Sequence, residues 1–158
     1  MKFADKEFLG KKDFALGVLK EGFGAGRILE FLSEALRKDK EVVLAAVKSY
    51  GKALQWADKE LQKDKDAYRE IVIAAVSQDP FALEFVSEEL QNDEKIVTLA
   101  VHIRGGALRY ASKDMRNNKE VVIAAYRSDY TALTYASAEL LENDSFIKLT
   151  DRIKRGLV

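Results

Sequence analysis

Apolar residues in this chain are gathered into short runs that recur at a nearly constant spacing. The clearest runs consist almost only of aliphatic residues and alanine, and they occupy residues 42–47, 71–76, 96–101 and 121–126. A short run rich in β-branched residues could form a buried strand, but alanine, a strong helix former, recurs inside every one of these runs. We therefore predict a helix for each. Because these helices are apolar nearly all round, we expect neighbours to bury them on several sides.

A short polar residue precedes each predicted helix. The column consists of Asp39, Asp64, Asp93, Asn118 and Asn143. A side-chain oxygen at such a position can accept hydrogen bonds from the free N–H groups that open a helix. We predict that each of these residues is an N-cap.

A turn and a second, shorter apolar segment follow each predicted helix. The turn residues are Gly51, Asp79-Pro80, Gly105-Gly106 and Asp129. Asp79 is a natural N-cap, and Pro80, the only proline of the chain, suits the first position of a helix. We therefore predict that a second helix begins there. This helix ends near a second polar column, which consists of Ser33, Asp58, Ser87, Ser112 and Ser137. A leucine or methionine follows each of these residues three positions later. We predict a tight turn, or one helical turn, at this point, with the leucine or methionine side chain buried beneath the neighbouring helices.

The two columns recur about every 25 residues, which is typical of stacked helical repeats. We predict repeats at residues 13–38, 39–63, 64–92, 93–117 and 118–142, with caps at 1–12 and 143–158. The third repeat carries four extra residues, Lys65 to Tyr68, which we interpret as one added helical turn. The predicted fold is a single all-α domain, an α-solenoid of about five helix-turn-helix repeats. The sequence leaves its right- or left-handed winding open.

The caps are predicted from atypical apolar segments at the two ends. Phe3, Phe8 and Leu9 suit a short amphipathic helix over the first repeat. In the last segment, Phe146, Ile147, Leu149 and Ile153 are expected to face the preceding repeat. Terminal repeats are expected to be atypical because one of their faces meets water.

The apolar runs and polar columns together resemble the repeats of a known family. The order E-V-V-x-A-A-V, then A-L-x-aromatic-A-S-x-E-L, then Asp or Asn, is similar to the tandem helical repeats catalogued as domain of unknown function 4116. The resemblance is good over residues 39–143 and weak over 13–38, and it departs at the four-residue insertion and at Thr98-Leu99. It implies an all-helical module of bacterial or microbial-eukaryotic proteins, often part of larger chains. It implies no established activity and supplies no catalytic residue.

Composition narrows the functional classes. The 158 residues include 26 Lys and Arg, 26 Asp and Glu, and no cysteine. Balanced charge gives no basic surface for nucleic acid or an anionic membrane, and the lack of cysteine removes thiolate metal sites and thiol nucleophiles. No segment is as long and apolar as a signal peptide core or a membrane span. We expect a cytoplasmic protein, with export that needs no such signal left open.

Candidate catalytic groups are few. The single histidine, His102, follows an apolar run where other repeats have solvent-tolerant residues, so we expect a surface position. Gly22, Gly24 and Gly26 lack the strand and spacing of a phosphate-binding loop and are interpreted as a turn. The carboxylates Glu60, Glu89, Asp114 and Glu139 recur once per repeat, as a solvated ridge would and an active site would not. We predict no enzyme activity and no catalytic, metal or cofactor-binding residue.

One aromatic residue ends the second helix of each repeat. The column is Phe31, Trp56, Phe85, Tyr110 and Tyr135. It can be interpreted as core packing between repeats, or as an exposed ladder that anchors a bound peptide. The second interpretation selects Trp56, Tyr110 and Tyr135, with the variable neighbours Gln55 and Arg109, as a candidate partner-binding set.

Three functional hypotheses follow. The first is a protein-protein interaction scaffold that binds an unidentified protein or peptide, with a monomer as the default state. The second is a helical repeat that binds RNA or another nucleic acid, which would require a basic stripe. The third is a carboxylate-based enzyme that uses His102.

Overall fold

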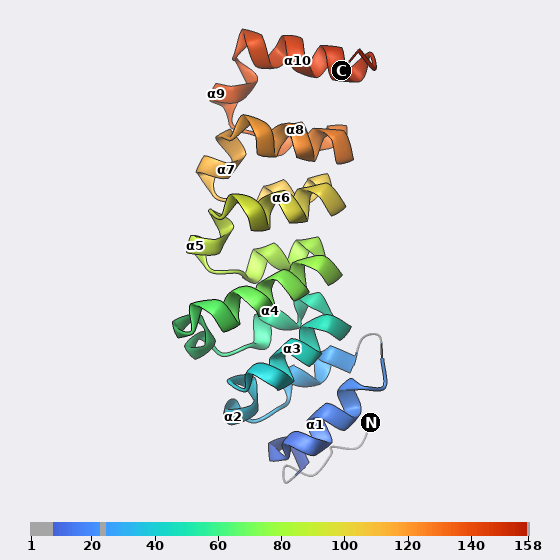
Figure 1. Cartoon of the computed structure of the whole chain (residues 1–158), viewed down its shortest axis with the longest axis vertical. Helices are drawn as coiled ribbons and strands as arrows, with labels where there is room; N and C mark the ends of the chain where they lie inside the picture. The colour runs from blue at the N-terminus through green and yellow to red at the C-terminus, as the bar shows by residue number, and fades with distance from the viewer. Residues whose placement is uncertain (1–7, 23–24, 158) are drawn as a thin grey trace. The chain divides into compact units, whose positions relative to one another are not determined.

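The computed structural model describes residues 8–22 and 25–157, and every regular element within them is helical (Figure 1). The predicted all-α repeat fold is confirmed. The chain divides into two compact units, Met1–Val86 and Ser87–Val158. The boundary between the two units falls within the third predicted repeat, residues 64–92.

The first unit is built around α3 (Lys40–Ser49). This helix packs against α1 (Lys12–Leu19) on one side and α4 (Lys65–Gln78) on the other, and also against the 3₁₀ helices η2 and η3. The remaining elements are η1 (Phe8–Gly10), η2 (Ala25–Glu30), α2 (Glu34–Arg37), η3 (Gly51–Trp56), η4 (Lys59–Lys63) and η5 (Pro80–Phe85). Helices of successive repeats therefore touch in sequence order within this unit.

The second unit repeats the arrangement around α6 (Glu94–Ile103) and α8 (Lys119–Ser128). These two helices pack on each other, and η6 (Gly105–Tyr110) packs on both α8 and η7 (Tyr130–Tyr135). The remaining elements are α5 (Glu88–Gln91), α7 (Lys113–Asn117), α9 (Ala138–Leu141) and α10 (Asp144–Lys154).

The predicted second helix of each repeat is a 3₁₀ helix. It has six residues in η3, η5, η6 and η7, and an extended residue such as Tyr50 (φ −150°, ψ 101°) precedes it. A short segment between two fixed ends suits the tighter 3₁₀ winding. The predicted tight turn that follows is a single helical turn, as in α2, η4, α5, α7 and α9.

The polar column caps the long helices as predicted. Asp39 Oδ1 accepts hydrogen bonds from the backbone N–H of Glu41 (3.0 Å) and Val42 (3.1 Å). Asp64, Asp93, Asn118 and Asn143 accept equivalent bonds at the starts of α4, α6, α8 and α10. These bonds satisfy N–H groups that have no partner within the helix.

A glycine at the start of three 3₁₀ helices brings each helix onto the next long helix. Gly26, Gly51 and Gly105 lie against the backbone carbonyls of Ala46, Ala75 and Ala125, leaving no space for a Cβ. Their N–H groups donate to side chains on that helix: Gly26 to Ser49 Oγ (3.2 Å), Gly51 to Gln78 Oε1, and Gly105 to Ser128 Oγ (3.1 Å). The three alanines are fully buried, so small residues on both sides permit the close approach.

The four-residue insertion forms an added turn at the start of α4, which has 14 residues where α3, α6 and α8 have 10. Its Ala67 and Tyr68 are buried. The apolar stripe of α4 keeps its phase, since four residues are close to one helical turn.

The two ends differ in part from the predicted caps. Phe3 lies outside the described residues, Phe8–Gly10 forms the 3₁₀ helix η1, and α1 begins at Lys12, one residue before the predicted repeat boundary. In α10, Phe146 is buried as predicted, but Ile147 is 43% exposed and faces solvent instead of the preceding repeat.

Candidate functional site

The aromatic column lies at the ends of the 3₁₀ helices and outside the buried core. Phe31 is 63% exposed, and Trp56, Phe85, Tyr110 and Tyr135 are half-buried. The leucine two residues before the aromatic is almost completely buried in η3, η5 and η6. The chain therefore buries the leucine between repeats, whereas the aromatic side chains of η3, η5, η6 and η7 are only partly buried.

In the first unit, the aromatic rings lie beside polar and cationic side chains. The rings of Tyr50 and Trp56 are 6.1 Å apart at an angle of 33°, and the ammonium of Lys52 lies 5.7 Å from the ring centroid of Phe81. Gln55 is exposed, and its Nε2 donates to the backbone carbonyl of Lys52 (3.0 Å). Contacts of this kind between a cation and a ring are worth about 0.5–1 kcal/mol at exposed sites.

A pocket of about 220 Å³ opens beside this part of the column. Gln55 and Phe85 line it together with Asp58, Gln62 and Tyr68. Gln62 Nε2 donates to the Tyr68 hydroxyl at 3.5 Å. Tyr68 belongs to the added turn of α4, so the insertion shapes this pocket, and sequence reasoning that treated the insertion as a length change missed it.

In the second unit, an arginine joins two aromatic rings of successive repeats. The guanidinium of Arg109 lies 4.8 Å from the ring centroid of Tyr110 and 5.9 Å from that of Tyr135. Arg109 is exposed, and its partners are half-buried. The structure thus brings together three of the five predicted partner-binding residues, while Gln55 and Trp56 lie side by side in the first unit.

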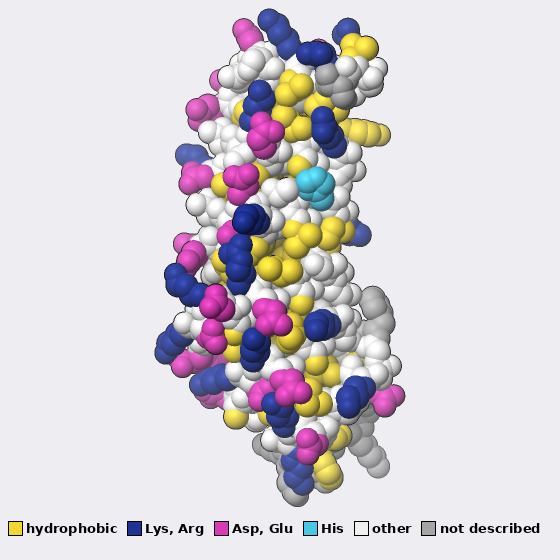
Figure 2. Space-filling view, viewed as in Figure 1, with side chains coloured by type: hydrophobic (Ala, Val, Ile, Leu, Met, Phe, Trp, Pro, Cys, Tyr) yellow, Lys and Arg dark blue, Asp and Glu magenta, His cyan; other side chains and the backbone are white. Residues whose placement is uncertain are grey.

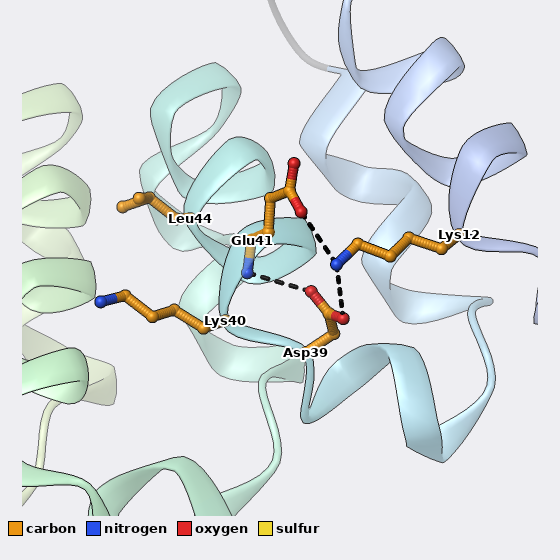
Figure 3. A pocket seen from close by; sticks show the side chains of 5 residues that line it. All are labelled: Lys12, Asp39, Lys40, Glu41 and Leu44. Atoms are coloured by element: carbon orange, nitrogen blue, oxygen red, sulfur yellow. Dashed lines mark hydrogen bonds and ion pairs between the residues drawn. The ribbon is translucent and has the colours of Figure 1, made fainter.

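Ion pairs connect the starts of the long helices in the first unit. Lys12 Nζ lies 2.8 Å from Asp39 Oδ2 and 2.8 Å from Glu41 Oε2, in an open pocket of about 410 Å³ (Figure 3), and Lys40 pairs with Glu70 at 2.8 Å. The hydrogen bond to Asp39 raises the pKa of Lys12. Burial acts to raise the pKa of Asp39, but the hydrogen bonds from Lys12 and the Val42 N–H outweigh it and lower this pKa. Two cations thus face three carboxylates, and the ion pairs link α3 to α1 and to α4.

The groups considered for catalysis are separated from one another. His102 is exposed on the last turn of α6, where Figure 2 shows it at the surface, and its Nδ1 lies 2.9 Å from the Thr98 carbonyl. Glu60 pairs with Lys63 (2.5 Å), which lowers the Glu60 pKa, and Glu139 accepts from Asn117 Nδ2 (3.4 Å). Within residues 8–22 and 25–157, no three His, Cys, Asp or Glu side chains are grouped to hold a metal ion.

The glycine-rich segment does not form a phosphate-binding loop in its described part. Gly22 has a φ of 113° in the turn after α1, Gly26 is the second residue of η2 and lies against Ala46, and Gly24 lies outside the described residues. The surrounding elements are helices on both sides, whereas a phosphate-binding loop follows a strand.

The visible face of each unit carries mixed charge. Figure 2 shows lysine and arginine side chains interspersed with aspartate and glutamate. None of the helices in the described part of the chain is both long enough and apolar enough to span a membrane.

Comparison with known proteins identifies the family of these repeats. No curated protein and no solved structure matches the chain. A family profile matches residues 11–62, 68–116 and 93–141, and each match covers two consecutive repeats. The second and third matches overlap by the repeat that contains α6, as expected when one unit is duplicated in tandem. Since these matches cover well over half of the residues, the chain belongs to the family described as Domain of unknown function (DUF4116).

Proposed function

We propose that this helical-repeat protein is a non-enzymatic interaction module that binds a partner protein or peptide on the surface formed by its 3₁₀ helices. The observation that carries the proposal is the contrast within these helices. At one position the leucine is almost fully buried in η3, η5 and η6, and two residues later the aromatic side chain is only partly buried.

The physical argument rests on preorganisation. An aromatic side chain held by a rigid helix offers a large apolar area with few rotatable bonds, so little entropy is lost when a partner covers it. Arg109 adds five hydrogen-bond donors between the rings of Tyr110 and Tyr135. The exposed position before the aromatic residue differs between successive repeats, where it is Gln55, Glu84, Arg109 and Thr134. Binding specificity can therefore vary while the helical framework stays the same.

The test is affinity purification from the native host followed by mass spectrometry, with wild-type protein and a variant carrying R109A, Y110A and Y135A. The matched control carries K119A and E120A, which change exposed residues at the start of α8. We expect a specific protein that the control retains and the triple variant loses. Recovery of the same proteins with both variants, or of none, would contradict the proposal.

Two further measurements separate the alternatives. Titration with single-stranded RNA at low and high salt tests the nucleic-acid hypothesis, for which binding that weakens steeply with salt is the signature. Fluorescence microscopy of the tagged protein in its host tests the expected cytoplasmic location.

A further inference from the structure

The junction between η7 and α10 differs from the other junctions within the two units. At three junctions the six-residue 3₁₀ helix is covered by the following long helix: η2 by α3, η3 by α4 and η6 by α8. A glycine at the second position of η2 and at the first position of η3 and η6 permits the close contact. In the second unit, α10 lies against α8 and α9, and it does not cover η7 in the same way.

Tyr130 marks this junction. It occupies the first position of η7, where Gly105 opens η6, and its side chain is 75% exposed. Leu133 is only half-buried, whereas its equivalent Leu108 is fully buried. The backbone approach seen between Gly105 and Ala125 depends on a residue without a Cβ, and Tyr130 does not meet this condition.

The space left between η7 and α10 is a pocket of about 670 Å³. Its lining residues are Tyr126, Arg127, Tyr130, Leu133, Ile153 and Lys154. Tyr126 is buried and Leu133 and Ile153 are half-buried, so the floor is apolar. A volume of this size is large enough for one or two bulky side chains of a partner.

The rim of the pocket is cationic. Arg127 and Lys154 are exposed, and within residues 8–22 and 25–157 no carboxylate forms an ion pair with either. The nearest carboxylates in sequence are Asp129, which accepts from the Thr131 N–H (2.9 Å) and hydroxyl (2.7 Å), and exposed Asp151. The pocket therefore combines an apolar floor with two cations available to an anionic partner.

We propose that this pocket docks an acidic peptide segment that presents a bulky apolar side chain. The apolar side chain would occupy the space between Leu133 and Ile153, and its flanking carboxylates would pair with Arg127 and Lys154. A second copy of the chain is a poorer occupant, because a two-fold contact at this pocket would bring the same cations of both copies together. The site is separate from the Arg109, Tyr110 and Tyr135 cluster and does not depend on the function proposed above.

The experiment is selection of phage-displayed random dodecapeptides on the purified full chain. We expect selected peptides to be enriched in Asp and Glu around a Leu, Phe or Trp. Binding of the synthesised peptides, measured by fluorescence anisotropy, should weaken at least about tenfold in an R127E/K154E variant and in Tyr130→Gly. The K113E/K119E variant has the same change in net charge away from the pocket and should bind like the wild type.

Three results would overturn the proposal. They are selected peptides without acidic enrichment, equal binding by R127E/K154E and wild type, and a dimer in sedimentation experiments that R127E/K154E dissociates. Circular dichroism checks that the variants fold, and R127Q/K154Q decides the question if charge reversal disturbs the helices. Loss of peptide binding in R109A/Y110A/Y135A with retention in R127E/K154E would assign the peptides to the Arg109, Tyr110 and Tyr135 cluster instead.

Discussion

Gly51, the first residue of η3, lies so close to the carbonyl oxygen of Ala75 in α4 that no side chain fits between them. A Cβ on Gly51 would also lie 2.9 Å from the backbone nitrogen of Asp79. Both neighbours are backbone atoms of a packed helix, so they cannot move aside as a flexible side chain could. We predict that Gly51→Ala lowers the free energy of unfolding by roughly 1–3 kcal/mol, measured by urea denaturation.

The matched control is Gly17→Ala. Gly17 lies in the exposed part of α1, and a Cβ there would have no neighbour within 4 Å. Alanine should stabilise this helix by about 0.5–1 kcal/mol. Destabilisation of similar size by both substitutions would contradict the close-packing explanation.

Asn118 should be replaceable by aspartate but not by alanine. Its Oδ1 accepts from the N–H groups of Glu120 (3.0 Å) and Val121 (3.2 Å) at the start of α8. Asn118→Ala removes both bonds and should cost about 1 kcal/mol in thermal or urea unfolding. Asn118→Asp keeps an oxygen acceptor and adds a negative charge at a helix N-terminus, so it should equal or exceed the wild type in stability. Equal losses in both variants would show that the cap is unimportant.

The helices and their caps could be predicted from sequence because they depend on local features. A capping oxygen, an alanine-rich run and the spacing of Asp39, Asp64 and Asp93 are all visible along the chain. The 3₁₀ winding of η3, η5, η6 and η7 was less visible, because it depends on how two fixed ends constrain a six-residue segment. The glycine contacts, such as Gly51 on Ala75, join residues 20 or more positions apart, and only the folded chain reveals them.

The candidate site was predicted only in part, for a similar reason. Periodicity located Trp56, Tyr110 and Tyr135 in one column, but exposure depends on how closely neighbouring repeats approach. Tyr68 was not predicted as part of a pocket, because its position beside Phe85 arises from the added turn of α4. The pocket beside η7 lies where Tyr130 stands in place of a glycine whose role in packing was not evident from sequence.

The stability of the first unit should decrease at acid pH partly through Asp39. Its pKa in the folded protein is lowered by Lys12 and the Val42 N–H, despite burial, which acts to raise it. A lowered folded pKa contributes stability above the unfolded value of about 3.9, and this contribution is lost as pH falls through the folded pKa. NMR titration of the Asp39 carboxyl should therefore give a midpoint below its ordinary value.

Substitution of Lys12 tests the origin of this shift. Lys12→Gln removes the cation 2.8 Å from Asp39 and should move the Asp39 midpoint upward, with a weaker loss of stability on acidification. Lys12→Arg keeps the positive charge and should leave the midpoint low. An unchanged midpoint in Lys12→Gln would mean that the helix N-terminus alone determines the pKa.

Trp56 should report directly on the proposed binding surface, because it is the only tryptophan in the chain. Its half-buried indole, 6.1 Å from the ring of Tyr50, should be accessible to acrylamide in the free protein. A partner that covers the first unit's 3₁₀ helices should reduce this quenching and shift the emission to shorter wavelength. A partner that binds without either change would have to lie elsewhere on the chain.

Deletion of residues 65–68 should leave a folded protein, because these residues add one turn and do not set the phase of α4. After the deletion, Asp64 would directly precede Arg69, as Asp39 precedes Lys40 in the preceding repeat. The loss of buried Ala67 and Tyr68 should cost roughly 1.5–3 kcal/mol, measured by urea denaturation, and should remove the pocket beside Phe85.

Deletion of only residues 65–66 is the control. Two residues correspond to about 200° of helix rotation, so η4 would join α4 on the opposite face of the helix. The chain could then keep the connection only by breaking the packing of η4 or of α4. Circular dichroism should therefore show near-native helix content for the four-residue deletion and a clear loss for the two-residue deletion, and the reverse order would refute the assignment of the insertion as a helical turn.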